Sequence, residues 1–199
     1  MDESTQGSHP VSDRVLTPPN VLSMLRLACV PIFLWLILTR QDSWAVVALT
    51  LSGVTDYLDG TIARRYNLVT RVGQLLDPLA DRLYIMSTLL GLAWRDIIPW
   101  WLVAILVSRE LFGTALLIVV RHHGYRALPV HFIGKAATFD LLFAFPLILL
   151  GQGDSTLASV ALPIGWAFAW WGTVLYWVAG VMYAVQTMRV VRDAKGFHR

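Results

Sequence analysis

The chain has 199 residues, of which 56% are hydrophobic, 12% aromatic and only 15% charged. Soluble domains carry about 25% charged residues, and a formal net charge of +3 is too small for a nucleic-acid-binding surface. A single cysteine, Cys29, excludes an internal disulfide and a cysteine-rich metal site. The composition therefore predicts an all-α integral membrane protein that has no nucleic-acid partner.

Six apolar stretches are long enough to cross a membrane, since a spanning helix needs about 20 mostly apolar residues. In chain order they are Asn20–Thr39, Ser43–Arg64, Gly73–Trp94, Ile97–Val120, Phe132–Leu150 and, within the uncharged run Leu157–Met188, Trp166–Met188. Pro163 and Gly165 predict a break near the start of this last run. We expect a six-helix membrane domain over residues 20–188, between an N-terminal segment of residues 1–19 and a basic tail of residues 189–199.

The distribution of lysine and arginine predicts the orientation in the membrane. One side collects the basic residues Arg64, Arg65, Arg71, Arg121, Arg126, Arg189, Arg192, Lys195 and Arg199. The loops of the opposite side contain only Arg40 and Arg95. Because lysine and arginine concentrate in cytoplasmic loops, both termini are expected to be cytoplasmic. We expect a multi-pass protein of the plasma membrane.

Charged residues inside five of the six spans fall at one depth. Counted from the outer end of each span they lie 12 to 16 residues inward, which is about 18–24 Å at 1.5 Å per residue. They are Arg26, Asp56, Asp59, Asp81, Arg109, Glu110 and Lys135. Each charge at such a depth costs at least about 2.5–3.5 kcal/mol on insertion scales, so the layer predicts a shared polar cavity open to the cytoplasm. A set of structural ion pairs, for example between Arg109 and a carboxylate, is the alternative.

The densest group of charges is a set of four aspartates on the second and third spans. Asp56 and Asp59 are three residues apart and Asp77 and Asp81 are four apart, so each pair shares one helix face. The short connection predicts that the two helices are antiparallel neighbours whose aspartate-bearing ends meet. Facing carboxylates repel one another without a cation, and oxygen ligands suit Mg²⁺ or Mn²⁺. We therefore predict two divalent cations that clamp a phosphate during in-line displacement.

Small and basic residues accompany the aspartates. Gly60 and Ala63 lie one and two turns beyond Asp56, where the lack of bulky side chains lets a ligand approach the helix backbone. Arg64 is placed to pair with a phosphate oxygen, and Gly73 gives similar access on the third span. Close helix packing is the alternative for the small residues, but four neighbouring aspartates favour a ligand site.

Together these residues form the pattern Asp56-x2-Asp59-Gly60-x2-Ala63-Arg64-x8-Gly73-x3-Asp77-x3-Asp81. The pattern resembles the signature of the CDP-alcohol phosphotransferases at all eight fixed positions, and the resemblance covers essentially the whole chain. It implies six transmembrane helices, a site that faces the cytoplasm, and homodimers. It also implies that Asp56, Asp59 and Asp77 hold one metal, that Asp56, Asp77 and Asp81 hold the second, and that Asp81 is the general base. Residues implied to contact the CDP-lipid are Asn20, Gly60, Ala63, Arg64, Thr70 and Gly73.

The reaction implied by this resemblance is attack by an alcohol on the lipid-linked phosphorus of CDP-diacylglycerol, with CMP as the leaving group. Candidate acceptor-binding residues come from the fourth and fifth spans and their connection: Arg109, Glu110, Arg126 and Lys135. Within the family, Ser108-Arg109-Glu110 and Gly134-Lys135-Ala-Ala-Thr138-Phe139 resemble the bacterial CMP-forming cardiolipin synthases, which use phosphatidylglycerol as acceptor.

Two alternatives to this function remain at the level of sequence. Phosphatidylglycerophosphate synthases, which use glycerol 3-phosphate, also resemble the chain, although Ala136, Ala137 and Asp140 depart from their pattern. An ion-coupled membrane transporter is the alternative from a different class. Transporters of that kind tend to have inverted repeats and broken helices that meet at the midplane, and this sequence has no repeat.

Overall fold

The computed structural model describes the backbone of residues 18–66, 71–122 and 132–196, and the side chains of residues 21–55, 79–122, 132–189 and 192. This part of the chain forms six helices joined by short connections. They are α1 (Pro18–Leu38), α2 (Asp42–Tyr66), α3 (Arg71–Trp94), α4 (Trp100–His122), α5 (Phe132–Leu150) and α6 (Thr156–Gly196). The predicted all-helical fold is confirmed, with α1 beginning at Pro18 and α4 beginning at Trp100 rather than Ile97.

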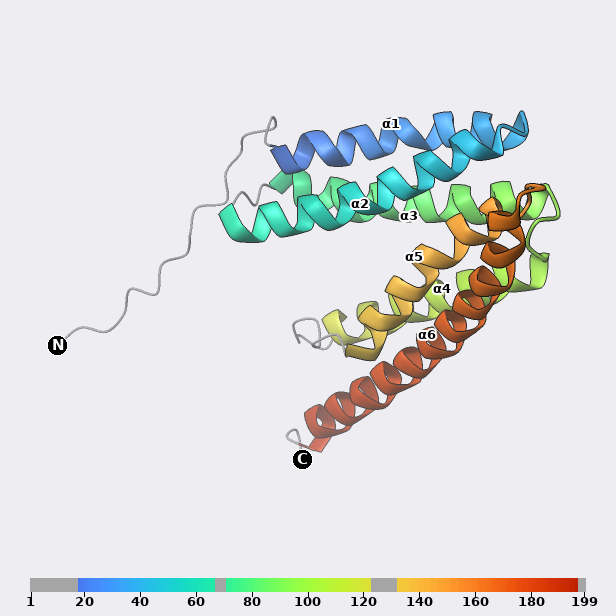
Figure 1. Ribbon diagram of the computed structural model, residues 1–199. Helices are drawn as coiled ribbons and strands as arrows, with labels where there is room; N and C mark the ends of the chain where they lie inside the picture. Colours follow the sequence, from blue (N-terminus) through green and yellow to red (C-terminus); the bar gives the residue numbers. More distant parts are fainter. Residues whose placement is uncertain (1–17, 67–70, 123–131, 197–199) are drawn as a thin grey trace.

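The helices form two groups of three (Figure 1). In one group α1 packs against both α2 and α3, and in the other α6 packs against α5 and α4. Contacts of α2 with α5 and of α3 with α4 join the groups. We call the end where residues 39–41, 95–99 and 151–155 connect the helices the loop end, and the opposite end the open end. The two groups meet at the loop end and diverge toward the open end (Figure 1).

The apolar core explains this shape, because it lies mainly in the half of the bundle near the loop end. Its largest fully buried apolar side chains are Phe33, Ile37, Leu92, Ile98, Leu102, Val120, Ile148 and Leu149. Except for Val120, they belong to the last turns of α1, α3 and α5 or to the start of α4 and the residues just before it. The predicted charge layer lies on the other side of this core.

Four helices are long and apolar enough to cross a membrane, counting only the residues that the structure describes. They are α1, α4, α5 and α6, with spans over Val21–Leu38, Trp100–His122, Phe132–Leu150 and Thr156–Arg189. Many of their large apolar side chains are exposed, including Trp35, Leu111 and Trp171. Exposed apolar surface on such helices is what a lipid environment requires. The helices α2 and α3 have 25 and 24 residues and lie beside α1.

The predicted break near Pro163 and Gly165 is wrong, because α6 runs without interruption from Thr156 to Gly196. Pro163 removes only one backbone hydrogen bond, and membrane helices tolerate such a loss. Gly165 instead allows α6 to pack closely against α5, because a Cβ at this position would lie 2.7 Å from the backbone nitrogen of Ile148. At 41 residues α6 is about 60 Å long, and residues 189–196 of the predicted tail are its last turns.

Two helix ends at the loop end have the same hydrogen-bond pattern. Arg40 follows α1 with a φ of 60°, and Asp96 follows α3 with a φ of 57°. In each case the amides of this residue and of the one after it donate hydrogen bonds to carbonyls in the last turn of the helix, as in a Schellman motif. After α1 the Arg40 amide donates to the Ile37 carbonyl and the Gln41 amide to the Leu36 carbonyl. The sharp turns keep both connections short.

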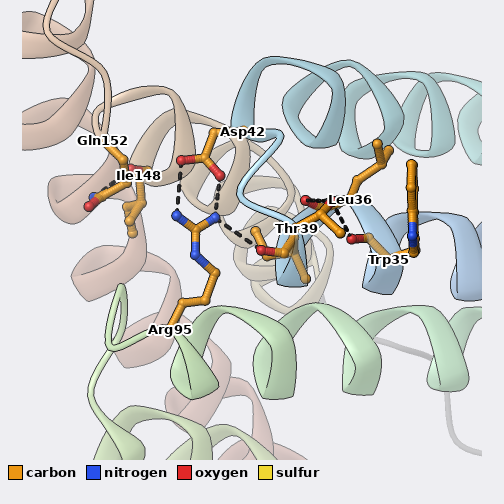
Figure 2. Close-up of polar contacts among 8 residues, drawn as sticks. Trp35, Leu36, Thr39, Asp42, Arg95, Ile148 and Gln152 are labelled. Carbon is orange, nitrogen blue, oxygen red and sulfur yellow. Dashed lines mark hydrogen bonds and ion pairs between the residues drawn. The ribbon is translucent and has the colours of Figure 1, made fainter.

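An ion pair joins these two connections (Figure 2). The Arg95 guanidinium contacts both carboxylate oxygens of Asp42 at the start of α2, and its Nη2 donates to Oδ2 over 3.1 Å. Its Nη1 also donates to the carbonyl of Ile37 over 3.2 Å. Because one side chain binds both the end of α1 and the start of α2, it fixes the position of α3 against both helices.

Candidate active site

Tyr84 fixes the level of α3 against α2. Its hydroxyl donates a hydrogen bond of 3.2 Å to the backbone carbonyl of Ala48. The two helices run in opposite directions, so seven residues lead from Tyr84 to Asp77 while eight lead from Ala48 to Asp56. These steps are about 10.5 and 12 Å at 1.5 Å per residue, and they bring Asp77 and Asp56 to nearly the same level.

The other two aspartates of the pattern lie one turn away from this level. Asp59 is three residues beyond Asp56 toward the open end, and Asp81 is four residues from Asp77 toward the loop end. All four positions thus fall within about 12 Å along the helix axes. The register thus places the four positions in one range of depth, and their roles as ligands stay predictions.

Asp81 is the one aspartate of the pattern whose side chain belongs to the described part, and it forms an ion pair with Arg26 of α1. The Arg26 residue is only 4% exposed, while the Asp81 side chain is 40% exposed. A buried guanidinium needs an anionic partner because an isolated charge in an apolar interior is strongly disfavoured. The pair therefore holds one face of the Asp81 carboxylate against α1 and leaves part of it accessible.

The fifth helix is aligned with α2 through a close contact. A Cβ built at Gly53 would lie 2.7 Å from Cδ1 of Leu142, so α5 packs directly onto the α2 backbone. The helices are antiparallel, and seven residues lead from Leu142 to Lys135 just as seven lead from Gly53 to Gly60. Lys135, whose side chain is exposed, lies at about the level of Gly60.

Arg109 on α4 packs against α6 rather than against a described carboxylate. Its guanidinium carbon lies 3.9 Å from the centre of the Tyr176 ring, and its Nε donates to the Tyr176 carbonyl over 3.0 Å. Two glycines make room for it, since a Cβ at Gly113 would lie 2.9 Å from Nη1 and one at Gly180 would lie 3.3 Å from Nε. A cation over an aromatic ring is stabilised by the ring quadrupole, so Arg109 joins α4 to α6.

Glu110 connects three helices. Its Oε2 accepts a hydrogen bond of 2.7 Å from the Tyr176 hydroxyl on α6, and its Oε1 lies 3.3 Å from Nε of Arg82 on α3. Nη2 of Arg82 also donates to Thr114 over 3.3 Å, and the Thr114 hydroxyl in turn donates to the Glu110 carbonyl. The charge layer is therefore partly ion-paired: Arg26 with Asp81, and Arg82 with Glu110.

Two members of this network were missing from the sequence prediction. Arg82 directly follows Asp81 inside the third apolar span, and a charge at such a position was enough to assign it to the charge layer. Tyr176 carries no charge, and the aromatic residues that surround it in the sequence hide its polar hydroxyl. The sixth span adds no charge to the layer, but its Tyr176 binds both Arg109 and Glu110 and so belongs to the network.

Several predicted site residues lie outside what the structure describes. Thr70 and Arg126 fall in the undescribed connections, and for the motif residues of α2, for Gly73 and Asp77 and for Asn20 only the helical backbone is described. Among the described side chains, no three metal-ligating groups gather. Carboxylate oxygens are the donors that Mg²⁺ and Mn²⁺ prefer, so the donor set offered by the four aspartate positions fits such ions.

Comparisons with known proteins agree with the motif. The sequence profile described as CDP-alcohol phosphatidyltransferase matches residues 16–185. A protein of Streptomyces coelicolor named cardiolipin synthase (CMP-forming) is 57% identical over 193 residues, covering 94% of this chain and 90% of the relative. A putative cardiolipin synthase of Mycobacterium tuberculosis is 45% identical, covering 91% of this chain and 87% of the relative. A probable phosphatidylglycerophosphate synthase of the same species is 31% identical, covering 88% and 84%.

The matched region contains all of α1 to α5 and most of α6, and with them every position of the aspartate pattern. Relatives under both enzyme names match over most of their own length, so the likeness is not confined to a fragment. The chain belongs to the CDP-alcohol phosphatidyltransferase family and is a transferase of phospholipid biosynthesis.

Proposed function

We propose that this enzyme transfers the phosphatidyl group of CDP-diacylglycerol to phosphatidylglycerol, which forms cardiolipin and releases CMP. The observation that carries the proposal is the 57% identity, over nearly the full length of both chains, to a relative named CMP-forming cardiolipin synthase. The family assignment gives no support to the alternative of an ion-coupled transporter.

The four aspartate positions are the proposed metal ligands. Asp56, Asp59 and Asp77 would hold one Mg²⁺ or Mn²⁺ ion, and Asp56, Asp77 and Asp81 the second. The levels of these residues on α2 and α3, set by the Tyr84 hydrogen bond, support this assignment. Bound there, divalent cations neutralise the pyrophosphate and the charge that develops during phosphoryl transfer.

Asp81 is the proposed general base. Its partly exposed carboxylate takes the proton of the acceptor hydroxyl while the hydroxyl oxygen attacks the lipid-linked phosphorus. The bond between that phosphorus and the CMP oxygen breaks, and CMP leaves with the electron pair. Arg26 supports the role because its ion pair fixes the carboxylate on α3.

The CDP-lipid is proposed to lie against the small residues of α2 and α3. Gly60, Ala63 and Gly73 leave the helix backbones accessible, while Arg64, Thr70 and Asn20 contact the nucleotide or its phosphates. The acceptor is proposed to meet Arg109, Glu110, Arg126 and Lys135. For Lys135 the support is that it lies at about the same level along the bundle as Gly60, which the contact between Gly53 and Leu142 sets.

We further propose six membrane spans with both termini and the site on the cytoplasmic side of the plasma membrane, and a homodimeric assembly. The distribution of charge supports the orientation. Basic residues lie at the open ends of α2, α3, α4 and α6, whereas at the loop end the charge of Arg95 is balanced by Asp42. An excess of lysine and arginine marks the cytoplasmic side.

Synthesis of phosphatidylglycerophosphate from glycerol 3-phosphate is the second candidate function, because a relative with that name is 31% identical. One experiment separates the two. The purified protein receives CDP-diacylglycerol and Mg²⁺ or Mn²⁺ with phosphatidylglycerol, glycerol 3-phosphate or inositol phosphate in separate reactions, and the lipid product is identified. Cardiolipin from phosphatidylglycerol is the expected result. A product with glycerol 3-phosphate alone would replace the first proposal by the second.

A further inference from the structure

Arg82 is a charged residue on the side of α3 that faces α4, next in sequence to the proposed base. It lies only 1.5 Å further along the helix axis than Asp81, at about 100° around it. Its side chain is 56% exposed, more than that of any other group in the described ion pairs of the layer. In a membrane-spanning bundle an exposed guanidinium at this depth is costly, and a polar ligand would offset that cost.

The contacts of Arg82 leave part of its guanidinium for such a ligand. Nε faces Glu110 and Nη2 faces Thr114, so both contacts use one edge of the group. A guanidinium has five N–H donors and a second pair of parallel donors at Nη1 and Nη2. Among the described residues, none accepts a hydrogen bond from Nη1. That end is suited to a bidentate contact with a phosphate.

We propose that Arg82 binds the phosphate of the acceptor, and that Glu110 and Tyr176 are positioning residues that hold Arg82 for it. The proposal rests on the proposed phosphatidyl transfer. This arrangement replaces the direct acceptor contact proposed above for Glu110, which would bring two anions together. The Glu110 oxygens instead bind Arg82 and the Tyr176 hydroxyl. The order of contacts from α6 to the ligand is Tyr176, Glu110, Arg82 and then phosphate.

The chemistry of both candidate acceptors fits a cation beside the base. Phosphatidylglycerol and glycerol 3-phosphate each contain a glycerol phosphate whose reacting hydroxyl and phosphate are at opposite ends of a three-carbon chain. In the proposed arrangement the hydroxyl lies at Asp81 and the phosphate at the long side chain of the next residue, Arg82. Arg82 therefore orients the acceptor hydroxyl toward the lipid-linked phosphorus, whichever of the two acceptors the enzyme uses.

Steady-state kinetics in mixed micelles of detergent and lipid test the proposal. KM is measured once for CDP-diacylglycerol and once for the acceptor, using whichever acceptor supports turnover. Arg82→Gln is expected to raise KM for the acceptor about ten- to a hundredfold, the loss of one charge-assisted phosphate contact. KM for CDP-diacylglycerol is expected to change less than twofold. Arg82→Lys keeps the charge and is expected to recover part of the loss. Arg189→Gln, on the exposed end of α6, is the matched control and is expected to behave as wild type.

A double-mutant cycle tests the positioning role. Glu110→Gln and Tyr176→Phe are each expected to raise KM for the acceptor several-fold in the wild-type background and to add nothing to Arg82→Gln. Additive effects would show that Glu110 acts independently of Arg82. An unchanged acceptor KM in Arg82→Gln would overturn the proposal. If that variant instead loses kcat and thermal stability at an unchanged KM, Arg82 forms a purely structural ion pair and the proposal is also overturned.

A binding measurement keeps the inference separate from the proposed function. The deacylated headgroup sn-glycero-3-phosphoglycerol, and glycerol 3-phosphate in a second arm, are titrated against the wild type and Arg82→Gln, and protection from thermal unfolding is recorded. Protection of the wild type by either probe, lost in Arg82→Gln, supports the phosphate site even if no cardiolipin forms. Equal protection of both proteins would refute it even if cardiolipin synthesis is established.

Discussion

Replacing Arg26 with methionine is expected to destabilise the protein while leaving the fold intact. The substitution removes a 4% exposed cation and leaves Asp81 without that partner. Removing one member of a fully buried ion pair costs about 3–5 kcal/mol. The Asp81 side chain is 40% exposed and regains some hydration, so we expect about 2–3 kcal/mol. For a chain of this length that is a fall in Tm of about 4–12 °C.

Thermal unfolding in detergent with a chelator present measures this effect without any contribution from divalent cations. The informative control is the double variant Arg26→Met with Asp81→Asn, which removes both charges of the pair. It is expected to recover at least half of the lost stability while remaining inactive, because the proposed base is gone. A Tm of Arg26→Met equal to that of wild type would refute the reasoning, and so would a double variant less stable than Arg26→Met alone.

Three further predictions concern packing and metal dependence. Arg95→Gln is expected to lower the free energy of unfolding by about 1.5–3 kcal/mol, the range for hydrogen bonds to charged groups, because it breaks the ion pair with Asp42. If this variant unfolds at the wild-type temperature, the pair contributes nothing to stability. Gly165→Ala is expected to lower the free energy of unfolding by about 1–3 kcal/mol, since the new Cβ would lie 2.7 Å from the Ile148 nitrogen. Gly153→Ala is expected to leave stability unchanged, because its Cβ would meet nothing closer than 3.7 Å. Similar melting of the two variants would argue against the close packing of α5 and α6. Removal of divalent cations is expected to abolish CMP release and their return to restore it; full activity in a chelator would exclude the proposed metal site.

The sequence was a good guide to the helices because each carries a long apolar run between polar connections. It also placed the aspartates correctly relative to one another within α2 and within α3, since helical spacing depends only on position in the chain. Their relation across the two helices depends on the register, which Tyr84 and Ala48 set through one hydrogen bond. Nothing in a hydrophobic pattern distinguishes that tyrosine from other aromatic residues of the span.

The wrong prediction for α6 has a similar origin. Proline followed by glycine is typical of a helix end in water, where the unpaired backbone groups bind solvent. In α6 the glycine instead permits contact with the α5 backbone, and the surrounding apolar environment favours continuous backbone hydrogen bonding. Whether a glycine ends a helix or packs against a neighbour is decided by the neighbouring helix, which the local sequence does not contain.

The ion pairs of the charge layer also required the three-dimensional structure. Depth along each helix predicted that Arg26, Asp81 and Glu110 belong to one layer, but not which charges face each other. The rotation of α3 turns Asp81 toward α1 and Arg82 toward α4. Two adjacent residues thereby pair with different neighbouring helices.

The proposed reaction and the role of Asp81 are tested most directly by comparing the wild-type protein with Asp81→Asn in separate, otherwise identical reactions. CDP-diacylglycerol, phosphatidylglycerol and Mg²⁺ or Mn²⁺ are supplied, and CMP release, cardiolipin formation and CDP-diacylglycerol binding are measured together. Equal amounts of CMP and cardiolipin are expected from the wild type. Neither product is expected from Asp81→Asn, although CDP-diacylglycerol binding remains detectable. Wild-type turnover in the variant would contradict the role of Asp81, and failure of the wild type to release CMP with any alcohol acceptor would contradict the proposed reaction itself.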